Sequence, residues 1–112
     1  MEIQTQEMKH CTLVKLSGHI DSATAPEVEE ELLSLIRIGN RNLVINLEDV
    51  SFVSSAGLSA LLSAKIKARR RVPPGDVVIS AITPAMKDTF ELVGLHHVFT
   101  FFDRDVDAVG TF

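Results

Sequence analysis

Residues 42–66 read NLVINLEDVSFVSSAGLSALLSAKI. The first part, Asn42 to Leu47, is a dense apolar run that is too short for a helix and rich in strand-forming residues, which predicts an interior strand of a sheet. The second part carries apolar residues at helical spacing, which predicts a helix with one apolar face: Leu58, Leu61, Leu62 and Ile66. A buried strand followed by an amphipathic helix is the unit from which parallel sheets are built.

The rest of the chain alternates strands and helices in the same way. We expect strands at 3–8 and 12–16 with a turn at 9–10, and then a helix capped by Asp21, Ser22 or Thr24 and ended by Gly39-Asn40. After residue 66, we expect a strand at 77–79 and a helix that is capped by Thr83, begins at Pro84 and is stopped by Gly94. The last elements should be a strand at 98–102 and a helix at 103–109. Inward-facing residues of the first and third helices should be Val28, Leu32, Leu35, Ile36, Met86, Phe90 and Val93. These patterns predict one α/β domain over residues 1–112, with helices packed on a mixed, mostly parallel sheet of four or five strands and an antiparallel hairpin at its edge.

Length, charge and composition exclude several classes of protein. With 112 residues, 11 Lys and Arg, 15 Asp and Glu and no Trp or Tyr, the chain has a net charge of −4 and no aromatic platform for bases, so we expect no direct binding to nucleic acid. The uncharged stretch from Ala56 to Ala64 is less than half of the ~20 residues that a membrane span needs. The N-terminus does not resemble a signal peptide, and we therefore expect a cytoplasmic protein that does not insert into a membrane.

Other candidate sites have simpler structural interpretations. Cys11 is the only cysteine, and we expect a small buried strand residue. The neighbours His96 and His97 should point apart, which disfavours a shared metal ion. The aspartates at 103, 105 and 107 lack the glycine and glutamate of a calcium loop, so we expect them to be solvated and to cap the last helix. The arginines at 69–71 suit a helix C-terminus, although a docking role for an acidic partner stays open. The sequence thus predicts no catalytic residue, no metal site and no cofactor.

Ser54 and Ser55 precede the second helix. Backbone N–H groups at a helix N-terminus lack partners and the helix dipole is positive there, so a phosphate on either hydroxyl would be stabilised in place. It would add a charge of about −1.5 to −2 without disrupting the fold. The alternative is that one of these serines only caps the helix.

Residues 45–58, INLEDVSFVSSAGL, closely resemble the signature of bacterial anti-sigma factor antagonists, the STAS domain family. Gly18-His19-Ile20-Asp21 is similar to the family's Gly-x-x-Asp after the second strand. Residues 81–87, together with Phe90 and Gly94-Leu95, are similar to its third-helix region. The resemblance spans nearly the whole chain and implies a single STAS domain.

The resemblance implies a protein that switches partners in transcription regulation. The unphosphorylated antagonist would bind an anti-sigma factor with a GHKL-type kinase fold, and a sigma factor would be released. The kinase would then phosphorylate Ser55, or alternatively Ser54, which would end the binding. A PP2C-type phosphatase would remove the phosphate. ATP and magnesium would belong to the kinase, and the antagonist would be a monomer or weak dimer. The residues implied in partner binding are Asp21, Ser22, Thr24, Ser54, Ser55, Ala56, Gly57, Leu58 and Ser59.

Two positions depart from the family pattern. Ser54 stands where an acidic residue is usual, and Ala56 stands where Ser or Thr is usual. The resemblance also leaves two other functions open: a STAS subunit of an ABC-transporter complex, and a scaffold component of a stress-sensing assembly. None of the three requires the chain to catalyse a reaction.

Overall fold

The computed structural model describes residues 1–112, and its centre is a five-stranded sheet. The strands lie in chain order: β1 (Glu2–Glu7), β2 (Thr12–Ile20), β3 (Asn42–Val53), β4 (Asp76–Ser80) and β5 (Phe101–Phe102). β1 pairs antiparallel with β2, and every other neighbouring pair is parallel. This confirms the predicted mixed sheet with an antiparallel hairpin at its edge.

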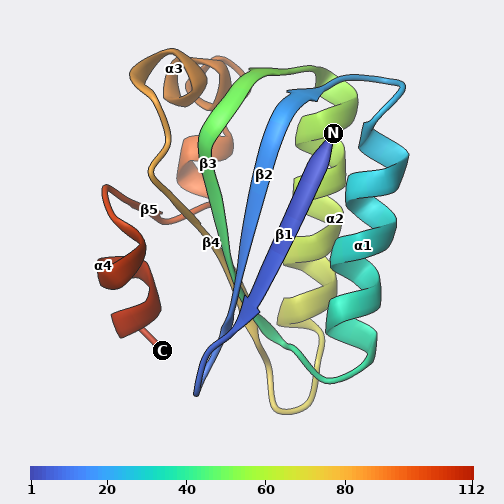
Figure 1. The fold of residues 1–112 in the computed structure, drawn as a ribbon, viewed down its shortest axis with the longest axis vertical. Coiled ribbons are helices and arrows are strands. Elements are labelled where there is room, and N and C mark those ends of the chain that lie inside the picture. The colour runs from blue at the N-terminus through green and yellow to red at the C-terminus, as the bar shows by residue number, and fades with distance from the viewer.

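Helices cover both faces of this sheet. They are α1 (Ala25–Arg37), α2 (Ser55–Arg69), α3 (Pro84–Leu92), the 3₁₀ helix η1 (Leu95–His97) and α4 (Asp105–Gly110). Figure 1 shows α1 and α2 side by side against one face, whereas the short α4 lies on the opposite side of the sheet. None of these helices is both long enough and apolar enough to cross a membrane.

The main core lies between the sheet and the pair α1 and α2. Alternate residues of β3, Leu43 and Ile45, point into it, while Val44 points to the other face and packs near Ala108 of α4. The predicted inward face of α1 is confirmed for Val28, Leu32 and Ile36, and Leu35 is half-buried.

Two predicted core residues are exposed. The buried face of α2 is made by Leu61 and the small residues Ala60, Ala64 and Ala68, whereas Ile66 lies outside this face and is 42% exposed. α3 ends at Leu92, one residue before Val93, which is 59% exposed where the chain turns at Gly94 with φ +78°. Helical spacing alone placed both residues on the inner face, but the close packing of α2 and the early end of α3 decide otherwise.

The expected strand at 98–102 is reduced to Phe101–Phe102. The backbone N–H groups of Val98 and Phe99 both donate to the carbonyl of Leu95, at 3.0 Å each, which continues the turn of η1 instead of extending the chain. The Phe99 ring is buried with its centroid 5.8 Å from that of Phe90 in an edge-to-face contact. The apolar residues of the segment 98–102 therefore reflect burial of Phe99 in the core rather than pairing of the whole segment in the sheet.

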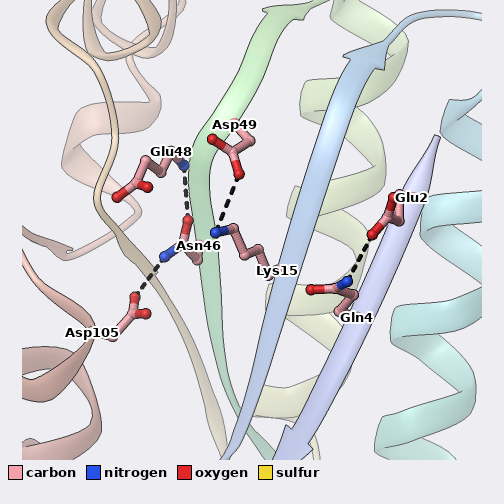
Figure 2. Close-up of polar contacts among 7 residues, drawn as sticks. All are labelled: Glu2, Gln4, Lys15, Asn46, Glu48, Asp49 and Asp105. Carbon is pink, nitrogen blue, oxygen red and sulfur yellow. Dashed lines mark hydrogen bonds and ion pairs between the residues drawn. The ribbon is translucent and has the colours of Figure 1, made fainter.

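A carboxylate anchors α4 to the sheet, which corrects the expected role of Asp105 in solvation and capping. Asp105 Oδ1 accepts hydrogen bonds from Asn46 Nδ2 at 2.8 Å and from Ser80 Oγ at 2.6 Å. The other end of the Asn46 amide accepts from the backbone N–H of Glu48 at 2.8 Å, so Asn46 links α4 to its own strand (Figure 2). Hydrogen bonds to a charged acceptor at a partly buried site hold the helix on this face.

Cys11 is buried as expected, but it lies in the turn immediately before β2 rather than in the strand. It packs in the small core beneath α4, and burial raises the pKa of its thiol. A thiol with a raised pKa is a poor nucleophile at neutral pH.

Candidate functional site

The carboxyl ends of β2 and β3 meet at one edge of the sheet. Ile20 and Val53 are register partners there, and the backbone N–H of Ser54 donates to the Ile20 carbonyl at 2.8 Å. This bond ties the loop before α1 to the loop before α2. Two segments that the sequence places more than 30 positions apart therefore form a single surface, in accord with the rule that ligands of parallel sheets bind at the carboxyl edge.

The two serines at this edge have different roles. Ser54 is the N-cap of α2: its backbone is extended, and its Oγ accepts a hydrogen bond from the backbone N–H of Gly57 at 3.2 Å. Ser55 is the first helical residue and is exposed, and its hydroxyl has no hydrogen-bond partner in the chain. The residue that caps the helix is thus distinct from the residue whose hydroxyl is free.

Gly57 allows α2 to begin this close to the strands. A Cβ at this position would lie 2.7 Å from Ile20 Cγ2, 2.8 Å from the Ile20 carbonyl oxygen and 2.9 Å from Val53 Cγ1. Contacts this short with backbone and with buried side chains cannot be relieved by a small rotation. Only glycine lets the start of the helix, and with it Ser54 and Ser55, lie directly over the ends of β2 and β3.

The loop before α1 is held by its own side chains. Asp21 Oδ1 accepts from the backbone N–H groups of Ala23 at 2.9 Å and Thr24 at 3.1 Å, and Thr24 Oγ1 donates to the carbonyl of His19 at 2.7 Å. The backbone bonds from Thr24 and then Ala23 lower the pKa of the Asp21 carboxyl. Of the three caps considered for α1, Thr24 occupies the N-cap position but makes no side-chain cap bond, and Asp21 instead fixes the preceding turn.

A groove joins the two loops and brings predicted site residues together. It has a volume of about 420 Å³, and its lining includes Ser22 from one loop and Ala56 and Ser59 from the start of α2, with Glu29 and Glu30 on the α1 side. No Lys or Arg lines it. Asp21 and Thr24 are occupied in their turn, so Ser22 is the residue of that loop that faces the groove.

A second hollow, which the sequence did not predict, lies on the other side of Ser55. It has a volume of about 220 Å³ and is lined by Ser55, Ser59 and four apolar residues: Leu58, Leu62, Val93 and Leu95. The last two come from the connection after α3. Helical spacing predicts Val93 in the core, so nothing in that pattern indicates that it lies beside Ser55. The signal that could have shown this is Gly94, because a glycine stops the helix and turns the chain just after Val93.

The side-chain clusters considered for metal binding do not assemble a site. The rings of His96 and His97 do not point apart as expected, because η1 brings their centroids to 3.8 Å, but no further ligand joins them. Nowhere do three His, Cys, Asp or Glu side chains come together in a way that could hold an ion. The arginines at 69–71 lie at the opposite end of α2 from Ser55.

Comparison with known proteins agrees with this architecture. The family model described as the STAS domain matches residues 2–108. A relative from Staphylococcus aureus, named anti-sigma-B factor antagonist, is 32% identical over 95 residues, which cover 85% of this chain and 86% of the relative.

Two solved structures share the fold. An anti-sigma factor antagonist from Mycobacterium paratuberculosis superposes with a TM-score of 0.83 at 27% identity, covering 98% of this chain and 92% of that chain. The phosphorylated form of the Bacillus cell fate determinant SpoIIAA has a TM-score of 0.74 at 18% identity, covering 98% of each chain. With the family match over almost its full length, this chain belongs to the STAS domain family.

Proposed function

We propose that this chain is an anti-sigma factor antagonist whose partner binding is switched off by phosphorylation of Ser55. Unphosphorylated, it binds an anti-sigma factor that is also a serine kinase, and a sigma factor is released. The names of its relatives support the first part. The observation that carries the second part is the exposed, unbonded hydroxyl of Ser55 at the first position of α2.

Ser55 is a better phosphate acceptor than Ser54 for a geometric reason. The Ser54 Oγ is half-buried and holds the N–H of Gly57, so its modification would remove a helix cap. Modification of the Ser55 hydroxyl breaks no hydrogen bond within the chain. A phosphate at this position is stabilised by the positive end of the helix dipole. Substitution of Ser for the usual acidic residue at 54 therefore preserves a cap without moving the acceptor.

The surroundings of Ser55 explain how one phosphate would end binding. No Lys or Arg lines the hollow that contains Ser55 or the adjoining groove, and Glu29 and Glu30 line that groove. A charge of about −1.5 to −2 would stay unpaired within the chain and face the partner next to the apolar residues Leu58 and Val93. Burying an unpaired charge against a partner is costly, so the complex dissociates while the domain keeps its fold.

The proposed partners supply the chemistry that this chain lacks. The anti-sigma factor has a GHKL-type kinase fold and holds ATP and magnesium, and a PP2C-type phosphatase removes the phosphate. The docking surface consists of the start of α2 and the loop before α1, where Ser22, Ala56 and Ser59 share a groove.

The test uses the anti-sigma factor kinase from the same genome. Incubated with it and ATP, the wild-type chain should gain one phosphate by mass spectrometry, and Ser55→Ala should gain none while still binding the kinase. Ser55→Asp should retain the fold and bind the kinase weakly. Ser34→Ala is the matched control, because Ser34 is a serine of α1 that lines neither hollow, and it should be phosphorylated like the wild type.

Two results would contradict the proposal. Phosphorylation that persists in Ser55→Ala and disappears in Ser54→Ala would assign the acceptor to the capping residue. Binding of a transporter ATPase in place of the kinase, unaffected by Ser55→Asp, would favour the transporter subunit.

A further inference from the structure

Cations collect at the end of the molecule opposite Ser55. Because β2, β3 and β4 are parallel, the connections that lead into them lie at one edge of the sheet. Seven of the 11 Lys and Arg residues lie in or beside these connections, and we call them the basic pole: Lys9, Arg37, Arg41, Lys67, Arg69, Arg70 and Arg71. A chain with a net charge of −4 thus presents one cationic end.

Most of the basic pole is not neutralised within the chain. Four ion pairs form, and Arg37, which contacts Glu30 at 3.0 Å, is the only member of the pole in any of them. Nor are the arginines needed to finish α2: the carbonyls of Ile66, Lys67 and Ala68 already accept backbone N–H groups, including that of Gly75 at 2.8 Å. Their guanidinium groups are therefore free to bind something else.

A groove with apolar walls leads into this pole. It runs between α1 and α2, has a volume of about 610 Å³, and combines Lys67, Arg70 and Arg71 with three apolar residues: Leu33, Ile66 and Val72. Ser63 and a single acidic residue, Glu29, complete the lining, so its three cations outnumber its one carboxylate. Ile66 is 42% exposed and Val72 is 96% exposed. Exposed apolar side chains framed by free cations are the features of a protein interface rather than of ordinary solvated surface.

We propose that this groove docks an acidic protein segment that carries apolar side chains. Its carboxylates would pair with Lys67, Arg70 and Arg71, and its apolar side chains would cover Leu33, Ile66 and Val72. Charge complementarity and the apolar walls select this occupant over single-stranded nucleic acid, which would need aromatic side chains that the groove lacks. A concave site also fits an inserted segment better than a flat lipid surface.

The cations of this groove lie far from Ser55, although the groove shares Glu29 and Leu33 with the groove beside Ala56. Ser55 and Arg70 are separated by the 15-residue α2, which is about 22 Å at 1.5 Å per residue. Exposed charges separated by more than about 10 Å are largely screened at physiological salt. Phosphate at Ser55 should therefore leave the groove's affinity unchanged, and the groove holds a partner in either state of the switch.

The probe is a synthetic peptide of four Glu-Glu-Leu repeats, titrated into the ¹⁵N-labelled full chain. Amide signals of residues 63–72 and of Leu33 should shift, and the shifts should weaken when salt is raised. Arg70→Glu/Arg71→Glu should lose about tenfold or more in affinity, because reversal replaces attraction by repulsion. Arg70→Gln/Arg71→Gln, which removes the two charges without reversing them, should lose less.

Lys87→Glu/Arg104→Glu is the matched control, since it makes the same change in net charge away from the basic pole and should bind like the wild type. An equal loss in this control, or no shift at residues 63–72, would overturn the proposal. Stronger shifts at those residues from a single-stranded oligonucleotide, from anionic phosphatidylglycerol vesicles, or from Glu-Glu-Ser repeats would show that the occupant is not an acidic, apolar segment. Ser55→Asp should bind the peptide like the wild type, so a failure of the Ser55 switch would leave this result standing.

Discussion

The two ends of α2 belong to one buried helix face but differ in the charge of the residues around them. Along the helix, Ala60, Ala64 and Ala68 are all fully buried in the main core. The amino end carries Ser54 and Ser55 among residues without a cation, and the carboxyl end carries Lys67 and the arginines at 69–71. Because a helix dipole is positive at its start and negative at its end, each end favours the opposite charge. The comparison teaches that the two proposed binding surfaces use the two ends of this helix, while its middle is buried in the core.

The largest effect should come from breaking the close approach at the amino end. Gly57→Ala places a methyl group 2.7 Å from Ile20 Cγ2, and we expect the free energy of unfolding to fall by about 1 to 3 kcal/mol despite the better helix propensity of alanine. Urea denaturation measures this. Gly110→Ala is the control, since its added Cβ meets nothing within 4 Å. A loss of stability in the control as large as that in Gly57→Ala would refute the steric explanation.

The next effect should separate the two serines of that end. Ser54→Ala removes the cap of Gly57 N–H and should lower the free energy of unfolding by about 1 kcal/mol. Ser55→Ala removes a hydroxyl without a partner and should change it by less than about 0.5 kcal/mol. Thermal or urea unfolding of both variants measures these changes. Equal losses in the free energy of unfolding would mean that both serines cap the helix.

A smaller effect, of opposite sign at the two ends, should follow from added negative charge. Ser55→Asp should raise the free energy of unfolding by about 0.3 to 1 kcal/mol at low ionic strength, and Arg70→Glu should lower it by a similar amount. Both differences should shrink in 0.5 M salt, because exposed charges are screened. Changes of the same sign in the two variants would show that the dipole does not govern these ends.

The smallest effect concerns pH at the loop beside the amino end. Hydrogen bonds from Thr24 and Ala23 lower the pKa of Asp21 below its ordinary value of 3.8, so its carboxylate stabilises the fold above that value. The contribution should disappear as the pH falls through the lowered pKa. The stability difference between the wild type and Asp21→Asn, measured by urea unfolding, should be present at pH 7 and narrow below pH 3.8; a difference that widens on acidification would contradict this assignment.

Local signals predicted much of the fold. The apolar run at 42–47 is the core of β3, Thr83 caps α3 through Met86 N–H, and Gly94 takes the left-handed conformation after that helix. Each of these depends on a residue's own backbone preference or on a neighbour within a few positions. The position of the candidate site, at Ser54 and Ser55 before α2, follows from the same kind of signal.

Other features depend on contacts between distant segments, and the sequence pattern misassigned them. Ile66 has helical spacing with Leu58 and Leu62 but lines the groove between α1 and α2, because the buried face of α2 is made by Leu61 and the alanines at 60, 64 and 68. Asp105 was expected in solvent and instead binds Asn46, which lies 59 positions earlier. No local pattern records such a partner.

By itself, the sequence determined the order of strands and helices, the parallel sheet with its hairpin edge, and the pair of serines where α2 begins, because these follow from periodicity, turn residues and capping chemistry. The tertiary structure decided which surfaces those elements share. Parallel pairing brings Ser22 to Ala56 and Ser59 at one edge and gathers Lys9, Arg41 and the arginines of α2 at the other. These groupings arise only when connections far apart in the chain meet at the same edge of a folded sheet.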